Sequence, residues 1–481
     1  MKSRFARHIV FPLHEWLLGR ATRVMNQELD DSQWWSPDDL RNLQQVKLRA
    51  LLQHAWGHIP HYTKKFRDAG VATKRIFSGG ESSLELLSNL PLLEKSDIRG
   101  GIEEMTWKNT PGRIFPQSTG GSSGEPVQFF VDRRRQACDQ AARIRAHRWF
   151  GVQLGDPELF LWGSPIEQTR TDRWKRLRDG LYRHQLLNAF DMSPQSMDSY
   201  WDAWDRFRPV ALYGYPSSIA LWVEHARRRQ RPMRNNRLRA VFVTGETCHP
   251  HQYEIIRNYF NVSVVDGYGS RDAGFISHQC PSGHRHVTSE HVHVEIVRNG
   301  QPVSVGETGE IVVTHLEAYA MPFIRYRTGD RGRLLPGRCP CGRGLPLMDA
   351  VQGRTTDFLC RPDGTIQHAL SIIYPLRELH GVRQFRVTQQ ADWSVHVELV
   401  PDRFPASITG ETVLRAVRPV LGETVSVHVE FVEAIAPSAS GKHRYVQSFV
   451  AGEKGMDATE TVDHENALAE VKEGQSHVSR P

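Results

Sequence analysis

The chain has 481 residues, 39% hydrophobic and 24% charged, with a formal net charge of +7 and a pI of about 9.1. This composition excludes a fibrous or wholly disordered chain and predicts two or more domains with large cores. The positive charge suits an anionic partner such as a nucleotide, and it equally suits nucleic acid or anionic lipid.

Six cysteines are too few for a disulfide framework, so we expect a protein of the reducing cytoplasm. No apolar run of the sequence reaches the ~18 residues that a membrane span needs. The basic, apolar segment 1–23 is interrupted by Pro12 and Glu15, which argues against a cleaved signal peptide. We expect a packed helix there, with peripheral contact to a membrane surface as the alternative.

Residues 1–100 are expected to be mainly helical. In segment 40–62 the apolar residues recur at helical spacing up to a break at Ile59-Pro60. They are Leu43, Val46, Leu48, Leu51, Leu52 and Ala55. Lys95, Ser96 and Asp97 indicate the start of another helix.

The stretch 117–130, QSTGGSSGEPVQFF, combines glycines with hydroxyl side chains. Gly120, Gly121 and Gly124 allow positive φ and close approach of the backbone to a ligand, and Ser122 and Ser123 add hydroxyl donors. The composition favours a loop that wraps a polyphosphate, with a linker or hairpin tip as the alternative.

Short apolar strands are expected at 127–131, 159–162, 210–213, 240–243 and 262–265, with helices at 133–150, 219–229 and 250–260. The helix at 133–150 is expected to be basic and amphipathic. This alternation predicts an α/β core domain at 101–353 with parallel pairing, in which ligands collect at the carboxyl ends of strands. Residues 287–313 alternate polar with apolar and predict antiparallel strands.

A small α+β domain is expected at 354–450, with strands at 384–400 and 425–432 and a helix at 409–421 between them. Residues 451–481 are polar, mostly acidic and free of aromatic residues, which predicts a disordered tail.

Six motifs occur in a fixed order: TGGSSGEP (119–126), YGSRDAG (268–274), GETGEIVVT (306–314), RYRTGD (325–330), GRTTD (353–357) and SGKHR (440–444). From about residue 40 to 450 the chain resembles the adenylate-forming acyl-CoA synthetase superfamily. It is most similar to the phenylacetate-CoA ligase family, in its capsule-biosynthesis-type branch. The resemblance implies Mg-ATP-dependent adenylation of a carboxylic acid and acyl transfer to a thiol, that of CoA, by a large domain and a small mobile one.

The resemblance also assigns roles. Asp272 occupies the position of a magnesium-binding acid that is more often Glu, Asp330 accepts hydrogen bonds from the ribose hydroxyls, and Lys442 is the mobile lysine of adenylation. The nucleotide-binding set is Thr119, Gly120, Gly121, Ser122, Ser123, Gly124, Glu246, Tyr268, Gly269, Ser270, Asp330 and Arg354.

The acid pocket is expected at the strand ends, from Tyr213, Tyr215, Pro216, Ser217 and Gly245, and its aromatic residues favour an aryl or other apolar acid. Thr356 stands where the family's hinge motif has Asp or Lys, with Asp357 following. Delivery of the acyl group to a carrier protein, an amine or a sugar hydroxyl is therefore an alternative to CoA. A homodimer is compatible with the chain.

Cys280, His286, Cys339 and Cys341 offer three thiolates and an imidazole, which suit a closed, structural zinc site. His284 is a rival ligand, and scattered reduced cysteines are the alternative. Cys138, Cys248 and Cys360 are expected to be packing residues.

Two other readings of the chain remain. A basic, zinc-stabilised nucleic-acid-binding protein would use the arginine-rich stretches 133–148 and 227–239. These contain few aromatic residues to stack on bases, so no specific nucleic acid is expected. The second alternative is a degenerate member of the family that binds ATP without turnover.

Overall fold

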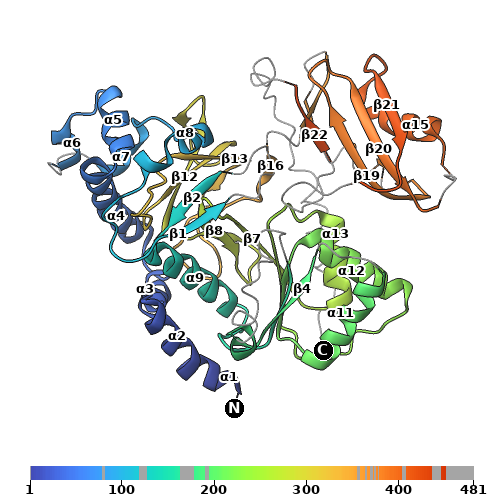
Figure 1. Ribbon diagram of the computed structural model, residues 1–481, viewed down its shortest axis with the longest axis horizontal. Coiled ribbons are helices and arrows are strands. Elements are labelled where there is room, and N and C mark those ends of the chain that lie inside the picture. Colours follow the sequence, from blue (N-terminus) through green and yellow to red (C-terminus); the bar gives the residue numbers. More distant parts are fainter. Residues whose placement is uncertain are drawn as a thin grey trace, which may run out of the picture. The chain divides into compact units, whose positions relative to one another are not determined.

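A computed structural model describes residues 2–77, 82–118, 127–162, 178–189, 194–354, 358–362, 366–368, 372, 375–376, 379–403, 408–435 and 446–450. The chain forms two compact units, the first of residues 1–355 with 437–443 and the second of 356–436 with 444–481 (Figure 1). Among the described residues, no helix has both the length and the apolar character to cross a bilayer.

The first unit begins with helices, as predicted. They are α1 (Lys2–Phe5), the π-helix η1 (Ala6–Val10), α2 (Phe11–Leu18), α3 (Thr22–Ser32), α4 (Pro37–His58), α5 (Pro60–Asp68), α6 (Thr73–Phe77), α7 (Ser83–Ser88) and α8 (Lys95–Met105). The break at Ile59-Pro60 is confirmed, because Pro60 occupies the first position of α5, where its missing N–H costs nothing.

Two details of the helical predictions are wrong. Val46 is 70% exposed although its spacing matches the buried face of α4. The cap of α8 is Glu94, one residue before the predicted start, because Glu94 and Asp97 form a reciprocal capping box that satisfies two backbone N–H groups.

A nine-stranded sheet forms the centre of the first unit, in the order β14-β15-β9-β8-β7-β6-β5-β3-β4. Its parallel part is β4 (His184–Asn188), β3 (Glu158–Trp162), β5 (Ala211–Gly214), β6 (Ala240–Thr244) and β7 (Ser263–Ser270). The rest is antiparallel: β8 (Gly274–Gln279), β9 (Arg285–Val287), β15 (Leu347–Met348) and β14 (Leu334–Leu335). The α/β prediction with parallel pairing is confirmed. The sequence does not predict β4.

Helices cover both faces of the parallel strands. Leu161, Leu212 and Val241 pack with helices α11 (Pro194–Phe207), α12 (Pro216–Arg228) and α13 (Pro250–Phe260). Ala240 and Phe242, which alternate with Val241 along β6, lie in a separate cluster, and the Phe242 ring stacks on His147 of α9 (Arg133–Arg148) at 3.9 Å. Because successive side chains along a strand point to opposite faces of the sheet, the two faces contribute to two separate hydrophobic clusters.

Helix α9 is not the basic amphipathic helix that the sequence predicts. Arg135 and Arg145 are 1% and 2% exposed, and residues on most sides of the helix are buried. Four of its arginines form ion pairs with carboxylates: Arg134–Glu317, Arg143–Glu158, Arg145–Glu290 and Arg148–Asp30. These arginines are not a free basic surface, which removes one feature behind the nucleic-acid alternative.

A five-stranded antiparallel sheet, as predicted for the later β-rich section, completes the first unit in the order β11-β10-β12-β13-β16. The strands are β10 (Val292–Arg298), β11 (Gln301–Pro302), β12 (Gly309–His315), β13 (Tyr326–Gly332) and β16 (Gln352–Arg354). Its buried face packs with the N-terminal helices, with Leu48, Leu52 and Tyr62 against Val313 and Tyr326. A short hairpin of β1 (Phe115–Ser118) and β2 (Gln128–Val131) precedes α9.

The second unit has a four-stranded sheet in the order β21-β20-β19-β22 and one helix, α15 (Gly410–Leu421), on it. The strands are β19 (Val382–Gln389), β20 (Val395–Pro401), β21 (Val427–Phe431) and β22 (Val446–Ser448), beside a hairpin of β17 (Phe358–Cys360) and β18 (Ile366–His368). The α+β prediction is confirmed. The single strand predicted at 384–400 is wrong, because a turn with Trp393 at φ 71° makes it a hairpin.

Candidate active site

Two strands from different sheets bring the predicted nucleotide-binding residues Tyr268 and Asp330 together. Tyr268 lies on β7 and Asp330 on β13. The Tyr268 hydroxyl donates a hydrogen bond to Asp330 Oδ2 at 2.9 Å, and the Asp330 N–H donates to Thr328 Oγ1 at 3.1 Å. The carboxylate is thereby held in a defined orientation. Gly269 and Ser270, next to Tyr268, pair with β8.

Asp272 follows in the turn between β7 and β8 and is 8% exposed. The Tyr326 hydroxyl donates to Asp272 Oδ2 at 2.5 Å, and the Ala273 N–H donates to Asp272 Oδ1 at 3.1 Å. Burial alone would raise the pKa of this carboxyl, but hydrogen bonds from Ser270 and Tyr326 and the charge of Lys95 hold the pKa below its ordinary value. Asp272 is therefore an anion at neutral pH.

Helix α9 supports the Asp272 turn from inside the protein. Arg135 Nη2 donates to the carbonyl oxygens of Arg271 at 2.9 Å and Asp272 at 2.5 Å. One turn along the helix, Asp139 Oδ1 accepts the Phe275 N–H at 2.9 Å. The sequence interpretation missed both residues, because no local pattern shows that an arginine reaches a turn 136 residues away.

Cys138 and His315 lie beside Asp139, with ligand atoms within 4.8 Å of one another. Burial raises the pKa of the Cys138 thiol well above its usual value, so this thiol stays protonated and unsuited to a metal. Cys138 is thus a packing residue, as expected. Asp139 instead stabilises the Asp272 turn by accepting the Phe275 N–H.

The carboxyl ends of β3, β5 and β6 carry the predicted acid-pocket residues. The rings of Trp162 and Tyr215 stack at 4.0 Å, and Tyr213 lies 5.6 Å from Trp162 between centroids. Gly245 has φ 85°, and a Cβ there would lie 2.9 Å from Tyr215 Cε1 and 3.1 Å from Trp162 Cη2. Any side chain at this position would collide with the stacked rings, and the positive φ also favours glycine.

Pro216, Ser217 and Glu246 lie at the start of α12. Pro216 opens the helix, and the Ser217 N–H donates to Glu246 Oε1 at 2.8 Å. Glu246, predicted to bind nucleotide, therefore also caps this helix with one carboxylate oxygen.

The four predicted zinc ligands lie together. Cys280 Sγ is 3.6 Å from Cys339 Sγ, Cys341 Sγ is 3.3 Å from His286 Nε2, and all four ligand atoms lie within 4.8 Å of one another. A tetrahedral zinc separates two thiolate sulfurs by about 3.8 Å. The donor types and spacing fit such a site. His284 is exposed and is not in the group.

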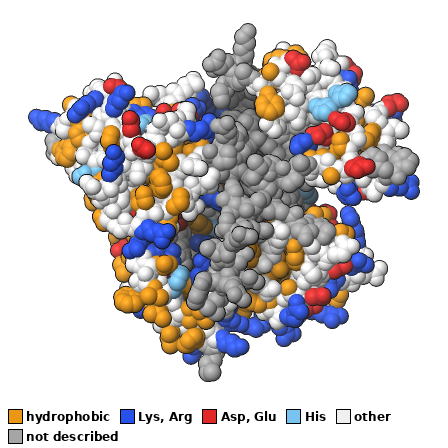
Figure 2. All heavy atoms as spheres, in the orientation of Figure 1, with side chains coloured by type: hydrophobic (Ala, Val, Ile, Leu, Met, Phe, Trp, Pro, Cys, Tyr) orange, Lys and Arg blue, Asp and Glu red, His pale blue; other side chains and the backbone are white. Residues whose placement is uncertain are grey.

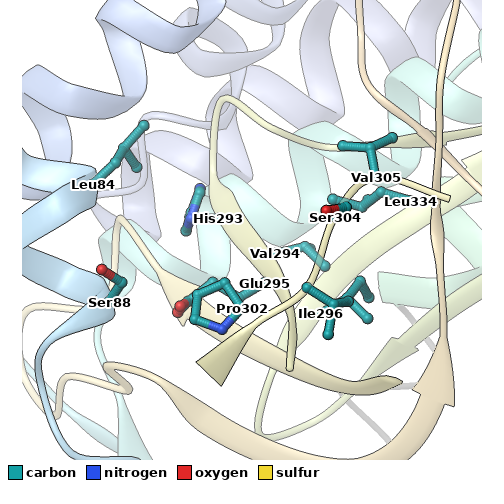
Figure 3. Close-up of a pocket in the computed structure, with 11 residues that line it drawn as sticks. Leu84, Ser88, His293, Val294, Glu295, Ile296, Pro302, Ser304, Val305 and Leu334 are labelled. Carbon is teal, nitrogen blue, oxygen red and sulfur yellow. The ribbon is translucent and has the colours of Figure 1, made fainter. Parts of the chain in front are cut away.

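A separate cavity of about 240 Å³ lies between α7 and the five-stranded sheet (Figure 3). Leu84, Ser88, His293 and Val305 are among its lining residues, and none of the predicted site residues is. Glu295 in its wall is engaged by Arg325 Nε at 3.1 Å. This cavity is not the candidate active site.

Comparisons with known proteins give the chain's relatives. Residues 359–448 match the family model described as the CapK C-terminal domain. Phenylacetate-coenzyme A ligase of Escherichia coli (strain K12) is 26% identical over 351 residues, 70% of this chain and 76% of the relative. That of Thermus thermophilus is 24% identical over 344 residues, 67% of this chain and 72% of the relative.

The chain is similar in sequence to the phenylacetate-CoA ligases.

A solved structure shares its fold. A 2-hydroxyisobutyryl-CoA ligase in the postadenylation state, in complex with R3-HIB-AMP, aligns with a TM-score of 0.67 at 20% identity. The alignment covers 92% of this chain and 94% of that chain. The C-terminal match agrees with the resemblance to the capsule-type branch, and the structural alignment shows a shared fold.

The other residues predicted from this family are only partly described. Thr119, Gly120, Gly121, Ser122, Ser123, Gly124, Lys442, Thr356 and Asp357 lie outside the described residues, as does the tail from 451. The backbone of Arg354, on β16, pairs with Asp330. The magnesium that the family implies fits Asp272, because a carboxylate that is anionic at neutral pH is the oxygen donor Mg²⁺ prefers.

Proposed function

We propose that this protein adenylates a carboxylic acid with ATP and then transfers the acyl group to CoA. The observation that carries the proposal is the hydrogen bond from Tyr268 to Asp330, which unites two motifs 62 residues apart. Tyr326, on the same strand as Asp330, holds Asp272. The ribose-binding and metal-binding carboxylates of the proposed site are thus organised by one strand.

In the first step, an oxygen of the acid attacks the α-phosphorus of ATP, pyrophosphate leaves, and an acyl-AMP forms. Asp330 would accept hydrogen bonds from the ribose hydroxyls, and Asp272 would hold the magnesium ion, which neutralises phosphate charge when bound. The loop of Thr119 to Gly124 would donate to the phosphates. Lys442 would stabilise the charge that grows in the transition state.

The aromatic walls favour an aryl or other apolar acid. The rings of Trp162 and Tyr215 stack on each other, and the Gly245 backbone packs so closely against them that only a glycine fits there. A flat, apolar acyl group fits such walls better than a charged one does, because its burial needs no compensating polar partner.

The test is acid-dependent release of pyrophosphate from ATP across a panel of aryl, fatty and sugar acids, with hydroxylamine present to trap the acyl-AMP as hydroxamate. Lys442→Ala should lose most adenylation and keep ATP binding, whereas a protein that only binds ATP would release no pyrophosphate with any acid. Unchanged release in Lys442→Ala would reject that residue's role. An exposed lysine elsewhere, Lys74→Ala, is the matched control.

The acyl acceptor needs its own test. The match of residues 359–448 to a CapK C-terminal domain favours keeping a second candidate, delivery to a carrier-protein thiol, an amine or a sugar hydroxyl. Replacing hydroxylamine by CoA and following thioester formation decides between them: adenylation without thioester would favour the second candidate.

We also propose a structural zinc ion bound by Cys280, His286, Cys339 and Cys341. Cys280 and His286 flank the β8–β9 turn, and the loop at 339–341 precedes β15, so the ion would link segments 59 residues apart. Metal analysis of the purified protein should find about one zinc per chain, and a strong chelator should lower the unfolding temperature. Cys339→Ser should lose the metal, and Cys248→Ser, outside the cluster, should keep it.

A further inference from the structure

The outer face of the first helical segment, α1 through α2, exposes a stripe of large apolar side chains. Phe5, Ile9, Leu13, Trp16 and Leu17 are 53%, 54%, 54%, 75% and 65% exposed. Their spacing of three and four residues puts them on one side of a helix. In Figure 2, hydrophobic side chains gather at the lower left, where Figure 1 draws α2.

The opposite face of the same helix is anchored to the first unit. Phe11 is 4% exposed and packs against Tyr182, with ring centroids 6.1 Å apart. His14 Nδ1 hydrogen-bonds the Tyr182 hydroxyl at 2.7 Å, and Arg7 Nε donates to the Leu154 carbonyl at 3.1 Å. Because these contacts fix the helix about its axis, the apolar stripe cannot rotate inward.

The charges around the stripe have one sign. Between residues 2 and 27 the sole acidic residue is Glu15, which is 4% exposed and pairs with Arg20 at 2.5 Å. The exposed cations of this segment are Lys2, Arg4 and Arg23. The surface that a partner meets is therefore apolar along its centre and positive at its margins.

We propose that this face, defined by Phe5, Ile9, Leu13, Trp16 and Leu17, lies on an anionic lipid membrane. A helix in the plane of the interface places its apolar side chains at the boundary of headgroups and acyl chains and its cations among anionic headgroups. Trp16, the most exposed of the five, has an amphipathic ring suited to that depth.

The charge argues for lipid over a second copy of the chain. Two copies that met through this stripe with twofold symmetry would bring Lys2, Arg4 and Arg23 of each near the same residues of the other, and these like charges oppose association. An anionic surface meets the same cations with favourable charge.

The experiment is flotation of the full-length protein with vesicles of phosphatidylcholine alone and of equal parts phosphatidylcholine and phosphatidylglycerol. We expect binding to the anionic vesicles that weakens as salt rises, and little binding to the neutral ones. Leu17→Glu should reduce binding at least about tenfold, because it puts a carboxylate into the apolar stripe beside anionic lipid. Leu221→Glu, at a leucine of α12 that is 40% exposed, should bind like the wild type.

Three results would overturn the proposal. They are no flotation of the wild-type protein, equal flotation with neutral vesicles, and a dimer in solution that Leu17→Glu converts to monomer without any vesicle binding. Far-UV circular dichroism and the unfolding temperature of each variant verify that a lost interaction is not lost folding. None of these readouts depends on adenylation.

Discussion

Helix α9 is rich in charged residues but buried, whereas the segment α1–α2 is rich in apolar residues that are exposed. α9 contains six arginines and is largely buried, while α2, with the sequence FPLHEWLL, exposes Leu13, Trp16 and Leu17. The difference lies in the partners. Arg135 and Arg145 reach backbone carbonyls and the carboxylate of Glu290, whereas Leu13, Trp16 and Leu17 of α2 remain more than half exposed.

Whether a side chain is buried depends on the partners that the rest of the chain provides for it. A buried arginine is tolerated where carbonyl or carboxylate oxygens accept from part of its guanidinium, because an unpaired buried charge costs several kcal/mol. A single exposed apolar residue has little effect on stability. A contiguous stripe of five promotes aggregation, so its presence points to a binding surface. Substitutions in α9 and in the segment α1–α2 test this dependence on partners.

Arg145→Met should destabilise the first unit by about 3 to 5 kcal/mol, because Glu290 would be left as a buried carboxylate without its cation. Urea unfolding of the two proteins measures the difference. Arg229→Met is the control, since Arg229 and its partner Asp198 are 61% and 47% exposed and solvent screens their attraction. The double variant Arg145→Met/Glu290→Met should recover most of the loss. A cost no larger than that of the control would contradict the account of α9.

Phe11→Ala and Trp16→Ala compare the two faces of one helix. We expect Phe11→Ala to cost about 3 kcal/mol, since it leaves a cavity beside Tyr182, while Trp16→Ala changes the free energy of unfolding by less than about 0.5 kcal/mol. The same urea experiment measures both. Similar losses in the two variants would show that Trp16 packs against the protein.

Arg135→Lys tests α9 as support for the active site. A lysine cannot donate to two carbonyl oxygens with the planar geometry of a guanidinium, so the Asp272 turn should loosen. We expect acid-dependent pyrophosphate release to fall about 10- to 100-fold, with a higher KM for Mg-ATP. Arg134→Lys, whose side chain is 54% exposed, should keep near wild-type values. An unchanged KM with a lower unfolding temperature would mean that Arg135 acts on stability alone.

The smallest effect concerns pH and the buried imidazole of His278, which lies 6.3 Å from Trp149 at the end of α9. Burial lowers the pKa of His278 to about 3 from 6.5. The unfolded chain binds this proton first as pH falls, so stability is lost below pH 6.5, by at most about 1.4 kcal/mol per pH unit, until about pH 3. Between pH 7 and 5.5 this residue should contribute a loss of about 1 kcal/mol, and His278→Gln should remove it. Identical pH slopes in the two proteins would show that His278 is already solvated.

Much of the fold is readable from the sequence where local chemistry and tertiary structure agree. α13 was predicted with its observed bounds, because Pro250 opens it and Asn261, in a left-handed conformation, ends it. β4, with the sequence HQLLN, was missed because it lacks β-branched residues and alternation. The strand at 384–400 was overextended because nothing in its hydropathy marks the turn at Trp393.

The residues of the candidate site likewise fall into those that local motifs predict and those that only the structure reveals. Tyr268, Asp272 and Asp330 follow from ordered motifs, and they lie together because β7 and β13 come from sheets that meet beside them. Arg135 and Asp139 were out of reach, since their contacts join α9 to a turn more than 130 residues later. The arginine run that seemed to mark a surface belongs to the helix that supports the Asp272 turn.

The alternation along β13 gives three residues of the candidate site a common orientation. Tyr326, Thr328 and Asp330 are all buried on the same side of that strand, two residues apart. A slip of the strand by a single position would turn all three outward at once, removing the clamp on Asp272 together with the partner of Tyr268. A molecule with this register error would therefore lose the whole candidate site and not only part of it. The active fraction of a preparation should equal the fraction of molecules in which β13 is correctly paired.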